Sequence, residues 1–439
     1  MRIPGLAPRF AAWRVLHDVR HGVAFDVALR RAIKDLEPDD KRLAHELAAG
    51  VFRRRSTLDA TLGGAIDKGL ASVRADTLDV LRLGAFQLLH LDRVPQHAAV
   101  QTTVGVARRL GGRRIAGFVN AVLRRLGHSA AVAVTDIDTD PDPDTDPDTD
   151  GVSDHPAWLV SRWLSRYGAA DTQRLLEWNN TRPKLVLQPA GRSIAELEAM
   201  LTDGGIGWNR APFDLGLVVD ARRPTELPGF AAGAFFVQDP AQQLVARFLA
   251  ALPNGLLYDA CAAPGGKALA LARQGHRVIA ADRQRARVRR LAENAARAGQ
   301  GRVTVIRADL LHAPLRRAGA VLLDVPCLGT GTLARNPDAR WRVTLPALTT
   351  LAARAARFLA AAAEIVEPGG LLLFATCSLE PEENEEQIAR FLAEDRRFRR
   401  EPAATVPSEV LTDVGDLQVL PQRHGADGAY AARLRKIAG

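Results

Sequence analysis

The strongest constraint on the fold is a regular alternation of short apolar runs with helical segments in the C-terminal half of the chain. Strands that are separated by helices form a parallel sheet covered on both faces, so this pattern predicts an α/β domain. The domain is expected to begin at Asp239, which can cap a helix that starts at Pro240 and runs to Leu252. The predicted strands are Leu256–Asp259, Val278–Asp282, Val303–Arg307, Ala320–Asp324 and Leu371–Thr376.

A glycine-containing loop, Cys261-Ala-Ala-Pro-Gly-Gly-Lys267, joins the first of these strands to a helix predicted over Ala268–Gln274. Such a loop lets a ligand approach the backbone at the positive end of the helix. The patterns GxGxxG and GxxxxGK[ST] are both absent, which argues against NAD and ATP. The next strand ends at Asp282, where an acidic side chain can bind the two hydroxyls of a ribose, and Asp309 follows the third strand at the same sheet edge. The sequence therefore predicts an adenosine-bearing ligand such as S-adenosylmethionine.

Two of the three cysteines follow strands at the same predicted edge, in Asp324-Val-Pro-Cys327 and Ala375-Thr-Cys377-Ser378. A thiolate that adds to carbon 6 of cytosine makes carbon 5 nucleophilic enough to accept a methyl group. An acid near ring nitrogen 3 and a base for the carbon-5 proton complete the chemistry. The spacing does not decide which thiol attacks. Three cysteines suit neither a disulfide framework nor a zinc cluster, so we expect no metal site and a reducing, cytoplasmic environment.

The N-terminal part of the chain shows helical periodicity throughout, and we predict an all-α bundle over residues 1–134. Its basic side chains include Arg53-Arg54-Arg55, Arg113-Arg114 and Arg124-Arg125, and together they favour contact with RNA. The formal net charge of the chain is +9. No apolar run is long enough to span a membrane, so we expect no membrane partner. The helices are predicted over Phe10–Val19, Lys41–Phe52, Arg74–Leu91 and Phe118–Leu126.

Residues 135–150 repeat Asp-Pro and Asp-Thr steps and are predicted to form an extended, disordered acidic linker. Residues 151–238 are predicted to form a small α+β RNA-binding subdomain, followed by the α/β domain over residues 239–439. Within the subdomain, Ser193 and Glu196 form a capping-box pattern. Its other elements are helices over Pro156–Tyr167 and Asp171–Asn180 and apolar runs at Arg182–Pro189, Leu215–Val219 and Phe235–Val237.

The strings CAAPGGK, DVPC, NPDARW and ATCSLEPEENE resemble the signature motifs of the RNA cytosine-5 methyltransferases. Their order along the chain is similar to the bacterial 16S ribosomal RNA members of the Sun/Fmu type. This resemblance implies a NusB-like bundle, an RNA-binding subdomain and a Rossmann-like methyltransferase domain that uses S-adenosylmethionine. It also implies 16S ribosomal RNA as the partner, and we expect a monomer.

Carried over by motif, the resemblance gives Cys377 the role of nucleophile, Cys327 the release of the methylated base, and Asp324 contact with the target cytosine. The implied cofactor-binding residues are Cys261, Ala262, Ala263, Pro264, Gly265, Gly266, Lys267, Asp282, Asp309 and Asp324.

Some positions depart from the family pattern. Arg340 stands where Lys is common, Ala268 where Thr is common, and Ala429 lies beside Tyr430 where another aromatic residue is usual. We interpret Glu383 and its acidic neighbours as complementing the dipole at a helix start. Two alternatives stay open: the same chemistry on tRNA or another ribosomal RNA site, and a non-catalytic NusB-like RNA-binding or assembly factor.

Overall fold

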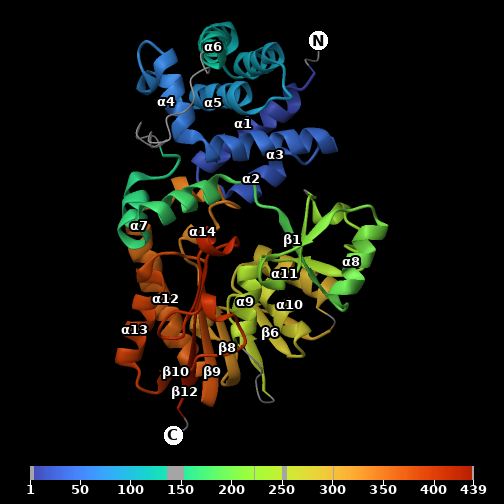
Figure 1. Ribbon diagram of the computed structural model, residues 1–439, viewed down its shortest axis with the longest axis vertical. Coiled ribbons are helices and arrows are strands. Elements are labelled where there is room, and N and C mark those ends of the chain that lie inside the picture. Colours follow the sequence, from blue (N-terminus) through green and yellow to red (C-terminus); the bar gives the residue numbers. More distant parts are fainter. Residues whose placement is uncertain (1–3, 136–152, 222, 250–254, 300, 438–439) are drawn as a thin grey trace. The chain divides into compact units, whose positions relative to one another are not determined.

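The computed structural model describes residues 4–135, 153–221, 223–249, 255–299 and 301–437, and Figure 1 shows the course of the chain. The chain forms two compact units. Unit 1 comprises Met1–Asn180 and Asn336–Arg342, and unit 2 comprises Thr181–Arg335 and Val343–Gly439. The predicted acidic linker lies outside the described residues except for Thr135, and so does the predicted helix end at Leu252. The domain boundaries inferred from the sequence stay predictions.

Unit 1 is built from helices, as predicted. The 40-residue helix α6 is interrupted at Gly111 and Gly112, and Gly112 has a φ of 71°, in the left-handed region that glycine adopts without strain. Helix α7 is interrupted in the same way at Gly168, with φ 75°, between the two helices predicted there. The bounds are α1 (Leu6–Arg20), α2 (Phe25–Ala32), α3 (Pro38–Arg53), α4 (Arg55–Ala65), α5 (Ala75–His90), α6 (Gln96–Thr135) and α7 (Ala157–Asn180), with a 3-10 turn at Leu70–Ser72.

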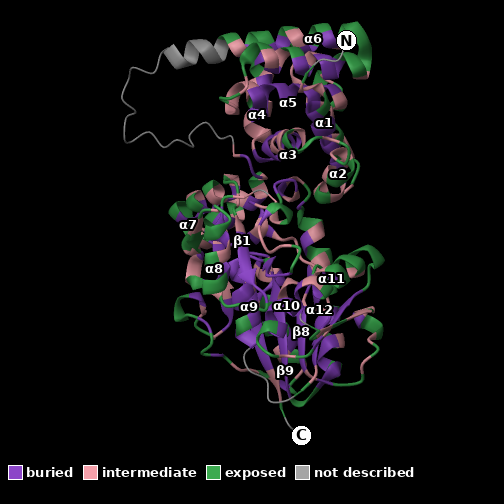
Figure 2. Cartoon of the chain, turned by 90° about the vertical axis from the view of Figure 1, so that its right-hand side faces the viewer, coloured by how far each residue is buried: buried purple, intermediate pink, exposed green. Residues whose placement is uncertain are grey.

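The core of unit 1 consists of the apolar stripes predicted from helical periodicity. Leu47 of α3, Leu58 and Leu62 of α4 and Leu81 of α5 are fully buried in one cluster. In Figure 2 the buried residues follow the inward sides of these helices. The bundle is therefore held by apolar burial along one face of each helix.

A short segment from far along the chain, Asn336–Arg342, belongs to unit 1. Arg340 is fully buried there and donates hydrogen bonds to the carbonyl oxygens of Asp154 (3.0 Å) and Asn179 (2.7 Å) and to Oδ1 of Asn180 (2.7 Å). The indole of Trp341 donates to the carbonyl of Phe52 at 2.7 Å. Arg340 thus closes the C-terminal end of α7, and Trp341 that of α3, where helix carbonyls lack intrahelical partners.

Unit 2 begins with a small antiparallel sheet in the order β2-β3-β1-β4. Helix α8 (Ile194–Asp203) packs on it and begins with the predicted capping box of Ser193 and Glu196. Leu187, Leu197 and Leu201 are fully buried between helix and sheet. The strands are β1 (Leu185–Pro189), β2 (Trp208–Arg210), β3 (Leu217–Val219) and β4 (Phe235–Val237), and only β2 was not predicted.

The larger sheet of unit 2 has the order β10-β12-β9-β8-β5-β6-β7, and β11 pairs with β12. The five predicted strands are present and all pair in parallel, which confirms the α/β prediction. The antiparallel strands β10, β11 and β12 extend the sheet beyond β9 and were not predicted. The bounds are β5 (Leu257–Asp259), β6 (Val278–Asp282), β7 (Val303–Arg307), β8 (Ala318–Asp324), β9 (Val366–Thr376), β10 (Phe398–Arg400), β11 (Leu417–Val419) and β12 (Ala429–Lys436).

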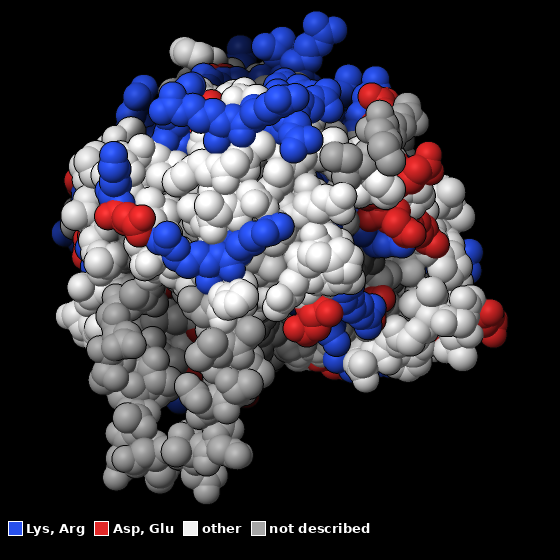
Figure 3. Space-filling model, turned by 90° about the horizontal axis from the view of Figure 1, so that it is seen from above, with Lys and Arg blue, Asp and Glu red and all other residues white. Residues whose placement is uncertain are grey.

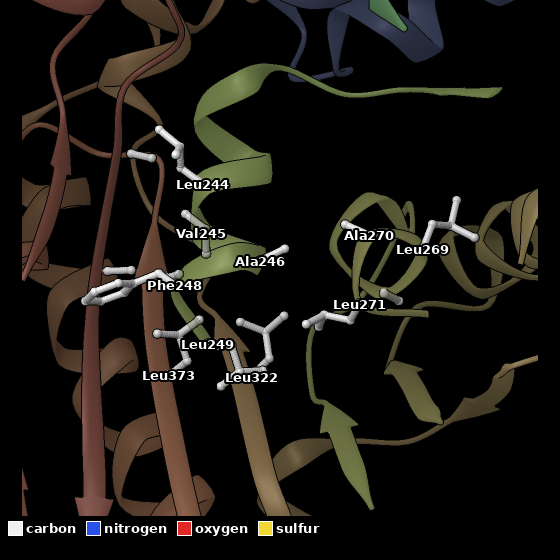
Figure 4. Packing of buried hydrophobic residues seen from close by; sticks show 14 of the residues in the cluster. Leu244, Val245, Ala246, Phe248, Leu249, Leu269, Ala270, Leu271, Leu322 and Leu373 are labelled. Carbon is white, nitrogen blue, oxygen red and sulfur yellow. The ribbon is translucent and has the colours of Figure 1, made fainter. Parts of the chain in front are cut away.

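Helices cover both faces of this sheet. On one face, Leu249 of α9 lies beside Leu322 of β8 and Leu373 of β9, in the same buried cluster as Leu244, Val245, Ala246 and Phe248, as Figure 4 shows. Asp239 accepts a hydrogen bond from the backbone of Ala241 at 3.0 Å, which confirms the predicted cap. The helices are α9 (Pro240–Leu249), α10 (Gly266–Arg273), α11 (Arg285–Ala298), α12 (Leu345–Ile365), α13 (Glu385–Glu394) and α14 (Pro421–His424). None of the helices in the described ranges has both the length and the apolar character needed to cross a membrane.

Candidate active site

The pairing of β8 with β9 brings the two predicted thiols together. Asp324 lies opposite Ala375 in the parallel register, and the backbone N–H of Val325 donates to the Ala375 carbonyl at 3.0 Å. Each cysteine follows its strand within three residues. The sulfur atoms of Cys327 and Cys377 consequently lie 3.5 Å apart.

The loop after Cys327 is fixed by backbone contacts that only glycine permits. The N–H of Gly331 donates to the Cys377 carbonyl at 3.0 Å, and the Gly331 carbonyl accepts from Gly428 at 2.7 Å. A Cβ atom at Gly331 would lie 2.6 Å from the Gly428 Cα and 2.9 Å from the Cys377 oxygen. Thr330 also accepts a hydrogen bond from the backbone of Leu379 at 2.8 Å. These contacts hold the loop after Cys327 against the segment from Cys377 to Leu379.

Glu383 ends the 3-10 turn Pro381–Glu383 directly before α13, but its carboxylate binds the loop after Cys327 and not the helix start, which corrects the interpretation drawn from the sequence. Its side chain is buried, and its two carboxylate oxygens accept the backbone N–H of Leu328 at 3.0 and 3.2 Å. Burial raises the pKa of Glu383 to about 7, against the lowering effect of its hydrogen bonds. Glu383 therefore supports the loop beside Cys327, and its proton occupancy changes near neutral pH.

The two thiols differ in their surroundings. The hydrogen bond with Cys377 and burial raise the pKa of Cys327 well above that of an ordinary cysteine, and the charge of Glu383 adds to this effect. The Lys267 ammonium is close enough to Cys377 for their charges to interact. The pair thus combines a thiol that is held protonated with one that faces a cation.

Lys267 joins the glycine loop to the strand end at Asp324. Its ammonium nitrogen lies 2.8 Å from the Asp324 carboxylate and also contacts Oε1 of Gln242 on α9. Burial lowers the pKa of Lys267, but the charge and hydrogen bond of Asp324 outweigh it and the pKa is raised. Lys267 is therefore a buried cation, paired with a carboxylate in which about a third of the side chain is exposed. Gln242 gave no signal in the sequence.

The glycine loop borders a cavity of about 310 Å³. Asp259 at the end of β5 lines it and is 1% exposed; burial and the nearby Asp324 charge raise its pKa to about 8. A Cβ atom on Gly266 would lie 2.9 Å from the Gln238 amide, so glycine keeps this wall of the loop compact. The residues of the predicted loop that line the cavity are Cys261, Ala262, Ala263, Pro264, Gly266 and Lys267.

Asp282 and Asp309 lie at the ends of β6 and β7, at the same sheet edge but not in the wall of this cavity. Asp282 is buried, accepts the N–H of Gln284 at 2.9 Å and lies 3.3 Å from Arg287. Asp309 caps a 3-10 turn by accepting the N–H of Leu311 at 3.1 Å. Each carboxylate is thus oriented by the backbone that follows its strand.

Arg335, which is partly exposed, forms ion pairs with two buried aspartates, and the sequence did not indicate this group. Its guanidinium lies 2.6 Å from both Asp239 and Asp427, and all three residues line the cavity. Burial and the Asp239 charge raise the pKa of Asp427 to about 7. Tyr430 is buried and donates to Asp416 at 2.6 Å, which places it in the core.

Known protein families match three parts of the chain. The family described as 16S rRNA methyltransferase RsmB/F matches residues 246–435, and the NusB family matches residues 7–128. A ferredoxin-like domain of RsmF/B-like methyltransferases matches residues 155–225. Together these matches cover most of the chain.

Curated proteins are similar to this chain over nearly its whole length. A probable ribosomal RNA small subunit methyltransferase B from Synechocystis is 34% identical, over 98% of this chain and 100% of that protein. The ribosomal RNA small subunit methyltransferase B of Pasteurella multocida is 31% identical, over 97% and 95% respectively. The solved structure of PH0851 shares the fold, with a TM-score of 0.81 and 23% identity over 99% of this chain and 100% of that one.

Proposed function

Because the chain belongs to the RsmB/F family of 16S rRNA methyltransferases, we propose that it methylates carbon 5 of a cytosine in 16S ribosomal RNA with S-adenosylmethionine as donor. One observation carries the proposal: two thiols lie 3.5 Å apart beside the Lys267–Asp324 ion pair. Methyl transfer to a nitrogen or an oxygen atom needs no pair of thiols. Activation of a pyrimidine carbon needs a sulfur that forms a covalent bond to the base and a second group that helps to break this bond after methyl transfer.

The glycine-loop cavity suits the methyl donor. The donor carries a sulfonium and an ammonium group, and the cavity is lined by the Asp324 carboxylate and by Asp259, whose raised pKa keeps it mostly protonated at neutral pH until a bound cation favours its ionised form. Its walls are formed by backbone and small side chains of the loop, with Lys267 and Asp324 at the side of the thiols. Asp282 and Asp309 are assigned to the adenosine part of the donor, as proposed from the sequence. When bound, the donor supplies an electrophilic methyl group.

Cys377 is assigned as the nucleophile. Its thiolate adds to carbon 6 of the cytosine, a C–S bond forms, and the electron pair of the C5–C6 double bond becomes available at carbon 5. Lys267 supplies a positive charge near the attacking sulfur. Asp324, which Lys267 holds at 2.8 Å, is assigned to contact with the ring of the target base.

Cys327 is assigned to the release of the product. After carbon 5 has taken the methyl group, its proton passes to a base, the C5–C6 double bond re-forms, and the C–S bond breaks with Cys377 leaving as thiolate. Cys327 serves as this base after its own proton has passed to solvent water, and its raised pKa, beside the attacking sulfur, makes its thiolate a strong base. Glu383 holds the loop that carries it.

The experiment is methylation of unmodified 16S RNA by the full chain with isotope-labelled S-adenosylmethionine, followed by digestion to nucleosides. We expect label in 5-methylcytosine. A tRNA preparation serves as the matched alternative substrate, and label in tRNA alone would move the substrate away from 16S RNA. Label in another nucleoside would contradict the thiol chemistry, and RNA binding with no methylation of either RNA would favour the non-catalytic assembly factor.

A further inference from the structure

Unit 1 contains a groove of about 790 Å³ that the proposed chemistry does not use. It is lined by residues from both halves of α6, because the break at Gly111 and Gly112 lets the second half return beside the first. The apolar side chains of the groove are Leu88, Val100, Val104 and Leu123. This surface therefore offers an apolar floor inside the groove.

The polar side chains around this floor are cationic or neutral. They include Arg108 and Arg124, the rings of His97 and His128, and the amides of Gln101 and Asn120, with no carboxylate among the lining residues. Both arginines are exposed and have neither an ion-pair nor a hydrogen-bond partner within the described ranges. Elsewhere in unit 1, Arg82 is paired with Asp59 and Asp79. Unpaired guanidinium groups beside a groove without acidic residues are complementary to a polyanion.

The surrounding surface has the same sign of charge. Arg113 and Arg114, which follow the break in α6, are also exposed and have no partner in the described part of the chain. Figure 3 looks onto the face where α6 lies and shows Lys and Arg side chains gathered in bands across it. A phosphate backbone that crossed this face would meet several cations in succession.

We propose that this groove binds a single-stranded segment of the RNA substrate, with an unstacked base on the apolar floor and the adjoining phosphates paired with Arg108 and Arg124. The inference rests on the proposed function only in taking RNA as the substrate. Proteins recognise single-stranded RNA by seating splayed bases on ring or apolar surfaces and by hydrogen bonding to the base edges. The amides of Asn120 and Gln101 supply such donors and acceptors, whereas bases stacked in a duplex cannot enter the groove.

The test compares binding of two fluorescein-labelled RNA probes to the full chain: a 12-nucleotide strand of mixed sequence, and the same strand annealed to its complement. The double variant Arg108→Gln/Arg124→Gln removes the two groove cations. The matched control Arg14→Gln/Arg31→Gln removes two exposed arginines of unit 1 that do not line the groove. Asn120→Ala removes an amide without changing the charge.

We expect the groove double variant to bind the single strand at least tenfold more weakly near 0.1 M salt. The slope of log affinity against log salt should become shallower by about 1.4, since each lost phosphate contact on a single strand contributes about 0.7. The control double variant should bind the single strand more tightly than the groove double variant does. Asn120→Ala should weaken binding of the single strand without changing the slope of log affinity against log salt. Circular dichroism of each variant verifies that the bundle is folded.

An equal loss of RNA affinity in the groove and control double variants would overturn the proposal, because the charge of unit 1 would then attract RNA without a defined binding site. Tighter binding of the duplex than of the single strand, with the same dependence on Arg108 and Arg124, would also overturn it. Unchanged RNA binding in all variants would overturn it as well, because neither the groove arginines nor Asn120 would then contact RNA. Methylation of 16S RNA is measured in parallel, so absent methylation with groove-dependent RNA binding would refute only the proposed chemistry.

Discussion

Replacement of Glu383 by Gln should stabilise unit 2, although it removes a buried group that contacts the active-site loop. Burial raises the pKa of Glu383 from an ordinary 4.5 to about 7. Between these values the folded protein holds a proton that the unfolded chain releases, so stability is lost as the pH rises through this window. A shift of about 2.5 pH units at 1.36 kcal/mol each corresponds to about 3 kcal/mol.

Glutamine has nearly the same shape, is never charged, and keeps a carbonyl oxygen for the N–H of Leu328. The Glu383→Gln protein should therefore match the wild type near pH 4.5 and exceed it by about 3 kcal/mol at pH 8. Guanidinium denaturation at several pH values, with hydrogen exchange of β8 and β9 as the local probe, measures this difference. Glu386→Gln, which removes an exposed charge from the neighbouring helix α13, is the control. A constant difference between wild type and Glu383→Gln across this pH range would refute the reasoning.

The remaining predictions concern the thiols, the loop and the buried arginine. Cys377→Ala should abolish methylation while S-adenosylmethionine still binds, as isothermal titration can show; a variant that still methylates would remove the assignment of the nucleophile. Gly331→Ala should lower kcat at least a hundredfold, because a displacement of about 1 Å at reacting groups has such an effect; Gly117→Ala, with no atom near its added Cβ, should be neutral in the same kinetic assay. Arg340→Met should destabilise unit 1 by about 2–4 kcal/mol, since four acceptors lose a buried donor, and Arg340→Lys should destabilise it less. Hydrogen exchange in α3 and α7, with α12 as reference, measures the effect of Arg340, and equal exchange in wild type and Arg340→Met would contradict it.

The parallel strands could be predicted from the sequence because each is a short apolar run between helical segments. Strand β12 was missed because Arg433 and Arg435 interrupt its apolar pattern. In the structure these arginines are satisfied by Glu401, which is distant in sequence, and the strand is buried by pairing with β9. A charged residue inside a buried strand requires a tertiary partner that no local pattern reveals.

Local sequence patterns predicted some residues of the candidate site and missed others. The ends of parallel strands meet at one edge, so the sequence could place the glycine loop, Asp324 and both cysteines together. The distance of 3.5 Å between the sulfur atoms depends on the register of β8 and β9, which is not encoded locally. The contact of Glu383 with Leu328 spans 55 residues, and its acidic neighbours made a helix-start role the simpler interpretation.

The central claim is that Cys377 forms the bond to the RNA and that Cys327 ends it. The most direct measurement is incubation of Cys327→Ala with 16S RNA and S-adenosylmethionine, followed by denaturing electrophoresis and mass spectrometry of the cross-linked peptide. The account predicts a denaturation-resistant adduct that joins Cys377 to a methylated cytosine and is absent from the double variant Cys327→Ala/Cys377→Ala. No adduct, or an adduct on another residue, would contradict it.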